Sequence, residues 1–291
     1  MCGIVGLFLK DKTLENSLGA MLTQMLVTMS DRGPDSAGIA VYRGADDGIV
    51  KITVQSANPK SDFEGLAETL GTEVEVIDTH AIISCSADKA PQMRAQIKQM
   101  PQLRVMSAGD AIEIYKEVGL PGTVAERFDI PRLQGSHGIG HTRMATESAV
   151  TTLGAHPFST GPDQCLVHNG SLSNHNSLRR KLARQGVEVE TENDTEVAAA
   201  YLTWKMQQGA NLGEALEAGL DDLDGFYTFV VGTKQGFGVL RDPIACKPAV
   251  LAETEQYVAF GSEYRALVNL PNIESARVWE PEPATVYFWE H

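Results

Sequence analysis

Hydrophobic residues recur at helical spacing near the start of the chain, between two stretches that have the pattern of strands. Residues 13–30 place leucines and methionines on one face of a predicted helix, which Gly33 and Pro34 end. The apolar runs 2–9 and 37–43 predict strands on either side of this helix. A methionine-rich stripe of this kind is typical of a face that packs into a core.

The second half of the chain predicts strands interrupted by helices. The predicted strands cover residues 136–145, 164–167, 226–233, 237–240, 250–252, 257–260 and 285–289. Predicted helices follow Ser173 and Asp194, and a third amphipathic stretch covers residues 212–223. Because the strand runs and helix runs alternate without regular βαβ crossovers, the pattern favours an α+β protein built from stacked layers of sheets and helices.

Residues 44–135 have a different pattern and predict an inserted subdomain between the two halves. Its predicted strands are 50–55, 74–77, 81–85 and 103–106, and its predicted helices are 61–70 and 92–99. The resulting order, β-α-β-β-α-β, is that of the ferredoxin-like arrangement. A short helix is also expected near residues 121–128.

The composition of the chain argues against several classes of partner and site. With 38 acidic and 24 basic residues the formal net charge is −14, which excludes nucleic acid as an expected partner. No apolar stretch approaches the about 20 residues of a membrane span, and the N-terminus has no basic leader, so we expect a cytoplasmic protein. The cysteines lack paired CxxC spacing, which predicts neither a disulfide framework nor a metal site.

Cys2 is the first candidate for chemistry. Removal of Met1, which we expect before a small residue, would leave Cys2 with a free α-amine beside its thiol. An α-amine has a pKa of about 7.7–8.0, so near neutral pH part of it can accept the proton of the thiol. The alternative is a small buried cysteine that opens a strand. Measurement of the intact mass of the protein would show whether Met1 is removed.

Five short motifs occur in a fixed order along the chain. They are Cys-Gly-Ile-Val-Gly at 2–6, Arg-Gly-Pro-Asp-Ser-Ala-Gly at 32–38, Gly-His-Thr-Arg-Met-Ala-Thr at 140–146, His-Asn-Gly at 168–170 and Asn-Asp-Thr-Glu at 193–196. Each motif alone is weak, but together they resemble the class II glutamine amidotransferases. That resemblance implies the four-layer αββα sandwich of the N-terminal nucleophile hydrolases.

The resemblance also implies a domain division and a reaction. The amidotransferase domain is expected over residues 2–43 and 136–291, interrupted by the segment 44–135. Cys2 would be the nucleophile and its α-amine the base in the hydrolysis of glutamine to glutamate and ammonia. Asn169 and Gly170 would donate hydrogen bonds to the oxyanion that forms during the attack.

The same resemblance assigns groups that hold the two ends of L-glutamine. Arg143 would bind the α-carboxylate, with the hydroxyl of Thr146 nearby, and Asp194 would bind the α-ammonium. Arg32 is a further candidate for contact with the substrate, although Arg32 and Asp35 are equally suited to structuring the loop over the site. His141, His156 and His168 are expected to be structural, since a thiol with its own amine needs no histidine base.

Each of these residues also has a simpler interpretation. Arg143 could form a surface salt bridge, as most arginines do. The pair Asn169-Gly170 is a common type I′ hairpin turn. Asn193 or Asp194 could serve only as the N-cap of a helix, although capping and ligand binding are compatible for Asp194.

The chain departs from the family pattern in ways that bear on its partners. Ala245 stands in an Arg-Asp-Pro motif where a glycine is usual, and no acceptor domain follows the amidotransferase domain. We therefore expect a synthase on another chain. The short free-standing form is most similar to the amidotransferase subunit of N-methylglutamate synthase. Its companions resemble the FMN and iron–sulfur part and the β-helical part of glutamate synthase, so no cofactor is expected in this chain.

The sequence leaves two other functions open, and it suggests a role for the inserted segment. The chain could be a stand-alone γ-glutamyl amidase of the same fold, which would transfer no ammonia. It could instead be a regulatory subunit that senses glutamine, for which Cys2 would be dispensable. The inserted segment 44–135 is a candidate docking surface for the synthase because of its position and its acidic flanks.

Overall fold

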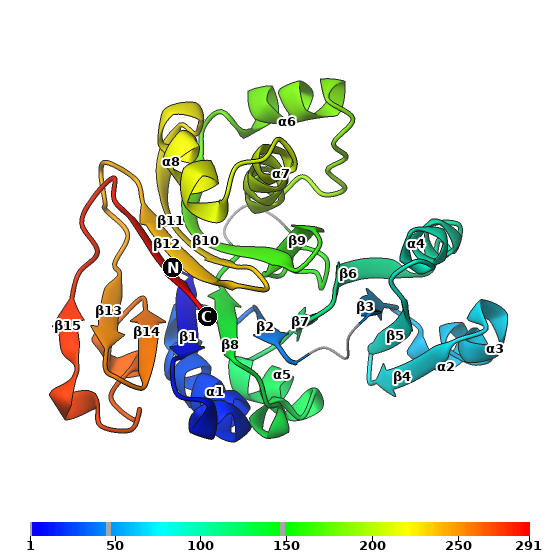
Figure 1. The fold of residues 1–291 in the computed structure, drawn as a ribbon, viewed down its shortest axis with the longest axis horizontal. Coiled ribbons are helices and arrows are strands. Elements are labelled where there is room, and N and C mark those ends of the chain that lie inside the picture. The colour runs from blue at the N-terminus through cyan, green and yellow to red at the C-terminus, as the bar shows by residue number, and fades with distance from the viewer. Residues whose placement is uncertain (1, 45–47, 146–148) are drawn as a thin grey trace.

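The computed structural model describes residues 2–44, 48–145 and 149–291, and its main body is built from four layers (Figure 1). Two antiparallel sheets face each other, and helices cover the outer face of each sheet. The predicted α+β class with an αββα sandwich is confirmed. None of the helices in the described ranges has the length and apolar character needed to cross a membrane.

The first sheet has seven strands in the order β15-β13-β14-β1-β8-β2-β7. Its strands are β1 (Gly3–Leu9), β2 (Ser36–Tyr42), β7 (Ile112–Val118), β8 (His137–Arg143), β13 (Val250–Glu253), β14 (Tyr257–Gly261) and β15 (Arg277–Trp279). Its outer face packs against α1 (Leu18–Thr28) and α5 (Pro121–Arg127). Val5 and Leu7 join the core beneath α1, whereas Ile4 and Phe8 join the core between the two sheets, so β1 is apolar on both faces.

The second sheet has five strands in the order β16-β12-β11-β10-β9. Its strands are β9 (Phe158–Gly161), β10 (Gln164–Leu172), β11 (Gly225–Gly232), β12 (Gly236–Arg241) and β16 (Val286–Glu290). Three helices cover its outer face: α6 (His175–Arg184), α7 (Asp194–Gln207) and α8 (Leu212–Asp222). Most of α7 is buried because it lies against β9 and β10 and between the other two helices.

Short 3-10 helices complete the main body. They are η1 (Lys12–Ser17), η2 (Ser30–Arg32), η3 (Ile130–Arg132), η4 (Tyr264–Ala266) and η5 (Ile273–Ser275). The helix predicted over residues 13–30 is therefore divided into η1, α1 and the start of η2. Asp11 caps η1 by accepting a hydrogen bond from the amide of Thr13, at 2.9 Å, which favours a tight first turn.

A third sheet of four strands, in the order β4-β5-β3-β6, forms a subdomain beside the main body (Figure 1). Its elements are β3 (Ile49–Gln55), α2 (Pro59–Asp62), α3 (Leu66–Leu70), β4 (Glu73–Ile77), β5 (His80–Ser86), α4 (Ala90–Lys98) and β6 (Arg104–Gly109). They follow the predicted β-α-β-β-α-β order, except that two short helices, α2 and α3, stand where a single helix over residues 61–70 is predicted. The subdomain has its own apolar core, which includes Ile52, Phe63 and Ile97.

The subdomain is shorter than the segment 44–135 that the sequence suggests. β7 and α5 lie within that segment, yet β7 pairs with β2 along its whole length, from Ile112 opposite Tyr42 to Val118 opposite Ser36. The strand was not predicted because its sequence, Ile-Glu-Ile-Tyr-Lys-Glu-Val, carries three charged side chains. The structure buries all three of them: Glu113 is 2% exposed, Lys116 4% and Glu117 7%.

Asp163 joins the second sheet to the turn between β6 and β7. It lies in the turn between β9 and β10 with a φ of 50°. Its carboxylate accepts hydrogen bonds from the amides of Asp110, Ala111 and Ile112 at 2.9, 2.8 and 3.0 Å. Asp163 therefore fixes the position of residues 110–112, where the chain passes from the subdomain back to the first sheet.

Replacing Asp163 with alanine should lower the free energy of unfolding by about 2–4 kcal/mol, because buried amides would lose their acceptor. Urea denaturation measures this change. Asp129→Ala is the matched control, since Asp129 has the same φ of 50° and its side chain is 62% exposed. A loss for Asp163→Ala no larger than that of the control would contradict the anchoring role.

Candidate active site

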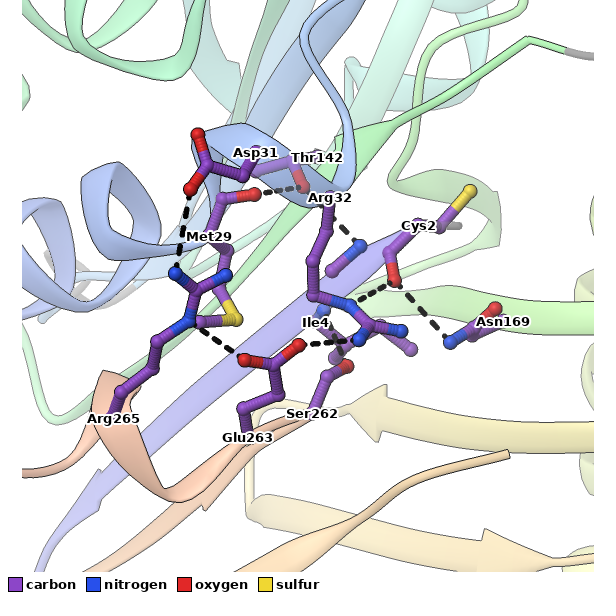
Figure 2. Close-up of polar contacts among 11 residues, drawn as sticks. Cys2, Ile4, Met29, Asp31, Arg32, Thr142, Asn169, Ser262, Glu263 and Arg265 are labelled. Carbon is purple, nitrogen blue, oxygen red and sulfur yellow. Dashed lines mark hydrogen bonds and ion pairs between the residues drawn. The ribbon is translucent and has the colours of Figure 1, made fainter. Parts of the chain in front are cut away.

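Cys2 lies at the entrance to β1, where side chains from neighbouring segments hold the first residues of the strand. The amide of Gly3 donates to the hydroxyl of Thr142 at 3.2 Å, and the amide of Ile4 donates to the hydroxyl of Ser262 at 2.9 Å. The side chain of Cys2 points away from Arg32 and Asn169, as Figure 2 shows, and the residue is partly exposed. The thiol is therefore accessible on a backbone that is fixed in place.

The carbonyl oxygen of Cys2 accepts two hydrogen bonds (Figure 2). Arg32 Nε donates at 2.9 Å and Asn169 Nδ2 at 3.3 Å. Arg32 is itself held by Glu263, with Nη1 2.5 Å from Oε1. The hydrogen bond from Arg32 lowers the pKa of Glu263, so this carboxyl is ionised and pairs with the guanidinium. Arg32 thus contacts the backbone of Cys2.

Ser262 and Glu263 are two residues of this site that the sequence analysis missed. They directly follow the apolar strand β14, which pairs with β1. A polar pair at the end of a buried strand is the signal that could have indicated them. Their partners, Ile4 and Arg32, are far away in the sequence, so the contacts themselves have no local signature.

Asn169 and Gly170 lie within β10 and do not form a hairpin turn. Asn169 is opposite Thr228 and Gly170 is opposite Tyr227 in the ladder with β11, so the hairpin interpretation is wrong. Gly170 has a φ of 146°, and a Cβ atom there would lie 1.9 Å from the carbonyl oxygen of Phe226. The position therefore requires glycine, directly after the residue whose side chain contacts Cys2.

Arg143 ends β8, beside Cys2. Gly3 pairs with Thr142 in the antiparallel ladder of β1 and β8, so the next residue of β8 lies at the same end of the sheet as Cys2. Arg143 is only 6% exposed, which argues against a surface salt bridge, and its Nη1 donates to the carbonyl of Ala149 at 3.2 Å. Thr146, the predicted neighbour of Arg143 in substrate binding, lies outside the described residues.

The loop from Arg32 to Asp35 packs directly on the end of β8. A Cβ atom on Gly33 would lie 2.4 Å from the carbonyl carbon of Thr142, so only glycine allows this approach. Asp35 accepts a hydrogen bond from the amide of Ala145 at 2.8 Å, and its own amide donates to the carbonyl of Arg143 at 3.1 Å. These contacts give Asp35 a loop-structuring role.

Asp194 is the first residue of α7, but Asn193 is the N-cap. The side chain of Asn193 accepts a hydrogen bond from the amide of Thr195 at 2.9 Å. Asp194 instead accepts from the amide of Leu172 at 2.9 Å, which ties its carboxylate to the end of β10. Burial raises the pKa of Asp194, but hydrogen bonding and charge from His168 and the Leu172 amide outweigh it and lower the pKa to about 2. An ionised carboxylate is therefore present at neutral pH.

The three histidines near the motifs form a buried group that joins several elements. His141 Nε2 contacts the carbonyl of His168 at 3.0 Å, and the His141 ring stacks on that of His156 with centroids 4.0 Å apart. Thr195 Oγ1 lies 2.7 Å from His156 Nε2 and 3.0 Å from His168 Nδ1. Burial lowers the pKa of His141 to about 3, and also lowers the pKa of His156, so both rings are neutral at neutral pH.

The Arg-Asp-Pro motif at 241–243 is hydrogen-bonded to the backbone of β11. Asp242 is fully buried and accepts hydrogen bonds from the amides of Tyr227 and Ile244 at 3.0 and 2.8 Å. Arg241 donates to the carbonyl of Ala245 at 2.6 Å. Ala245 has a φ of 51°, in the left-handed region that favours glycine.

The segments around Cys2 bring several of the predicted site residues together. Cys2, Arg32 and Asn169 are in direct contact, Gly170 adjoins Asn169, and Arg143 ends the strand beside Cys2. Asp194 is joined to Leu172 at the end of β10, three residues after Asn169 in the same strand. Among the described residues, no group of three or more histidine, cysteine or acidic side chains could hold a metal ion.

Comparison with known proteins places the chain in a family. A family profile described as "Glutamine amidotransferase domain" matches residues 141–269. The chain is 67% identical to "Glutamine amidotransferase-like protein GlxB" of Rhizobium meliloti (strain 1021), in an alignment that covers 100% of this chain and 99% of the relative. The chain belongs to the glutamine amidotransferase family. This amidotransferase is also 34% identical to the "Putative glutamine amidotransferase" of Methanothermobacter thermautotrophicus, over 99% of both chains.

Solved structures share the fold at low sequence identity. The glutamine phosphoribosylpyrophosphate amidotransferase of B. subtilis matches with a TM-score of 0.64 and 19% identity. A second structure, titled the allosteric regulatory enzyme of purine biosynthesis, matches with a TM-score of 0.66 and 19% identity. Each alignment covers 99% of this amidotransferase and 47% of the other chain. The shared part has the N-terminal nucleophile hydrolase fold.

Replacing Ala245 with glycine should raise the free energy of unfolding by about 0.5–1 kcal/mol, because glycine adopts a positive φ without strain. Urea denaturation tests the change. Ala183→Gly is the control, since Ala183 is exposed within α6 and the same substitution there should destabilise by a similar amount. A loss of stability at both positions would show that the backbone at Ala245 is not strained.

Proposed function

We propose that this amidotransferase is a glutaminase that uses Cys2 as its nucleophile and serves a synthase on another chain. After removal of Met1, the α-amine of Cys2 takes the proton from the thiol, and the thiolate attacks the side-chain amide carbon of glutamine. The C–N bond breaks, the amine returns its proton to the leaving nitrogen, and ammonia departs from a γ-glutamyl thioester. Water then attacks the thioester and releases glutamate and the free thiol.

The contact between Asn169 and Cys2 carries this proposal. The Asn169 side-chain amide lies 3.3 Å from the carbonyl oxygen of Cys2, so a donor stands beside the residue whose sulfur would attack. Gly170 follows in the same strand, where close packing against the backbone of Phe226 and Tyr227 fixes its position. A pair of fixed donors suits the oxyanion of the tetrahedral intermediate, because preorganised dipoles need no reorientation during the reaction.

The buried Arg143 and the half-buried Asp194 suit the two ends of the substrate. Arg143 can grip the α-carboxylate through two parallel hydrogen bonds, with Thr146 as a further donor. Asp194 is ionised at neutral pH and can pair with the α-ammonium. We assign Arg32 to holding the backbone of Cys2, since its Nε donates to that carbonyl.

We propose that the ammonia passes to a separate synthase subunit in the cytoplasm. Free ammonia is readily protonated and lost to solvent, so its release is useful only beside an acceptor site. The sequence resemblance favours a complex like N-methylglutamate synthase or glutamate synthase. The FMN and iron–sulfur cluster would then belong to the FMN-containing partner, and a β-helical subunit would complete the assembly.

The glutamine analogue 6-diazo-5-oxonorleucine should add one covalent mass to the purified protein, located on Cys2 by peptide mapping. Cys2→Ala should abolish both this label and glutamine hydrolysis, whereas Cys246→Ala, which removes an exposed cysteine, should leave both intact. The intact mass should also lack Met1. Labelling elsewhere, or hydrolysis that survives Cys2→Ala, would reject the mechanism. No label and no hydrolysis in the wild type would instead favour a regulatory role that only binds glutamine.

Asp194→Asn should raise KM for glutamine about ten- to one hundred-fold, because a charge-assisted contact with the α-ammonium is lost while the shape is kept. Steady-state assays of glutamate release measure the effect. Glu214→Gln is the control, since Glu214 is an acidic residue in the first turn of the neighbouring helix α8 and glutamine preserves its capping contact. An unchanged KM for Asp194→Asn would remove this residue from the substrate site.

A further inference from the structure

Lys116 and Glu117, two adjacent charged residues of β7, form hydrogen bonds with residues 149–157, the segment after the motif at 140–146. Lys116 donates to the carbonyls of Ala155 and Pro157 at 2.8 and 3.2 Å, with that of Leu153 at 3.5 Å. Its ammonium also lies 4.5 Å from the centre of the Phe158 ring. A buried ammonium has three donors to satisfy, and this segment supplies three carbonyl oxygens.

Glu117 points to the opposite face of β7, where it joins the same segment to the inserted subdomain. Its Oε1 accepts a short hydrogen bond from the hydroxyl of Thr152. Its Oε2 accepts from the hydroxyl of Thr79 at 3.1 Å, and Thr79 lies in the turn between β4 and β5. Beside this contact, Asp78 pairs with Arg127 of α5 at 2.7 Å. One buried carboxylate therefore contacts both the subdomain and the segment.

The other end of the segment reaches Arg143. Nη1 of Arg143 donates to the carbonyl of Ala149 at 3.2 Å, and a Cβ atom on Gly154 would lie 3.3 Å from the same nitrogen. Residues 149–157 therefore lie between β7 and the guanidinium that we assign to the substrate carboxylate. A shift of this segment would change the position of Arg143.

A cleft of about 530 Å³ separates α4 and β6 from the loop between α6 and α7, with Lys116 in its lining. An exposed ion pair, Lys98 with Glu188, spans the same region. Exposed pairs of this kind hold two bodies together only weakly. The contacts of Glu117 at β7, which Figure 1 shows on the side of the first sheet that faces the subdomain, are buried and are the firmer link.

We infer that Glu117 is a positioning residue through which the inserted subdomain sets the geometry of the glutamine site. The path runs from Thr79 through Glu117 to Thr152, and from there along residues 149–157 to Arg143. This inference rests on the proposed function of Arg143 as the group that holds the substrate carboxylate. It gives the subdomain a role in glutamine binding in addition to any docking role.

Isosteric variants test the two halves of the path. Thr152→Val and Thr79→Val each remove one hydroxyl that donates to Glu117 while keeping the side-chain volume. Each should raise KM for glutamine about three- to ten-fold, in line with the loss of one hydrogen bond, and change kcat less than two-fold. Thr152→Ser and Thr79→Ser restore the hydroxyl and should restore KM. Amide hydrogen exchange across residues 149–157 should be faster in both valine variants.

Thr53→Val is the matched control within the same subdomain. Thr53 is fully buried in β3, and its hydroxyl has no hydrogen-bond partner among the described residues, so KM and exchange should stay at the wild-type values. The inference is overturned if both test variants of an active enzyme keep KM within two-fold, or if the control shifts KM equally. If the wild type hydrolyses no glutamine, the proposed function fails separately. In that case the hydrogen-exchange measurement still tests the inference. Unchanged amide exchange across residues 149–157 in Thr79→Val would show that the subdomain is not coupled to this segment.

Discussion

The carbonyl oxygen of Cys2 holds together segments that are far apart in the chain. It accepts from Arg32, which follows the first helix, and from Asn169, which belongs to the second sheet. Arg32 in turn is paired with Glu263 at the end of β14. The first residues of a chain normally fray, because few contacts oppose their conformational entropy. These hydrogen bonds, together with those from the amides of Gly3 and Ile4, hold Cys2 and the start of β1 where the two sheets meet.

Different layers of the fold carry different residues of the proposed site, and each layer holds its residues in a fixed position. Cys2 directly precedes the first strand of the first sheet, and Arg143 ends another strand of that sheet. The second sheet carries Asn169 and Gly170, and the start of α7 carries Asp194. Each group is supported by backbone contacts, so the proposed site is held in place before any substrate binds. The same logic extends to β7, whose buried charges hold the segment next to Arg143. The subdomain is thus connected to the site through a strand of the main sheet.

Much of the fold could be predicted from local pattern, because apolar periodicity and the order of elements are local properties. The failures have physical causes. β7 was missed because Glu113, Lys116 and Glu117 give it the appearance of an exposed segment, whereas ion pairs and carbonyl oxygens allow their burial. Asn169-Gly170 matched a hairpin turn by local preference, but the pairing of β10 with β11 extends this pair as strand.

The order of the motifs was enough to indicate the family and the candidate residues, since side-chain chemistry and sequence order are properties of the chain itself. The partners of those residues were not readable in the same way. Glu263 beside Arg32, Leu172 beside Asp194, and Thr79 with Thr152 on either side of Glu117 are contacts between distant positions. Such contacts depend on how the sheets and helices pack in three dimensions, and no local pattern in one sequence encodes that packing.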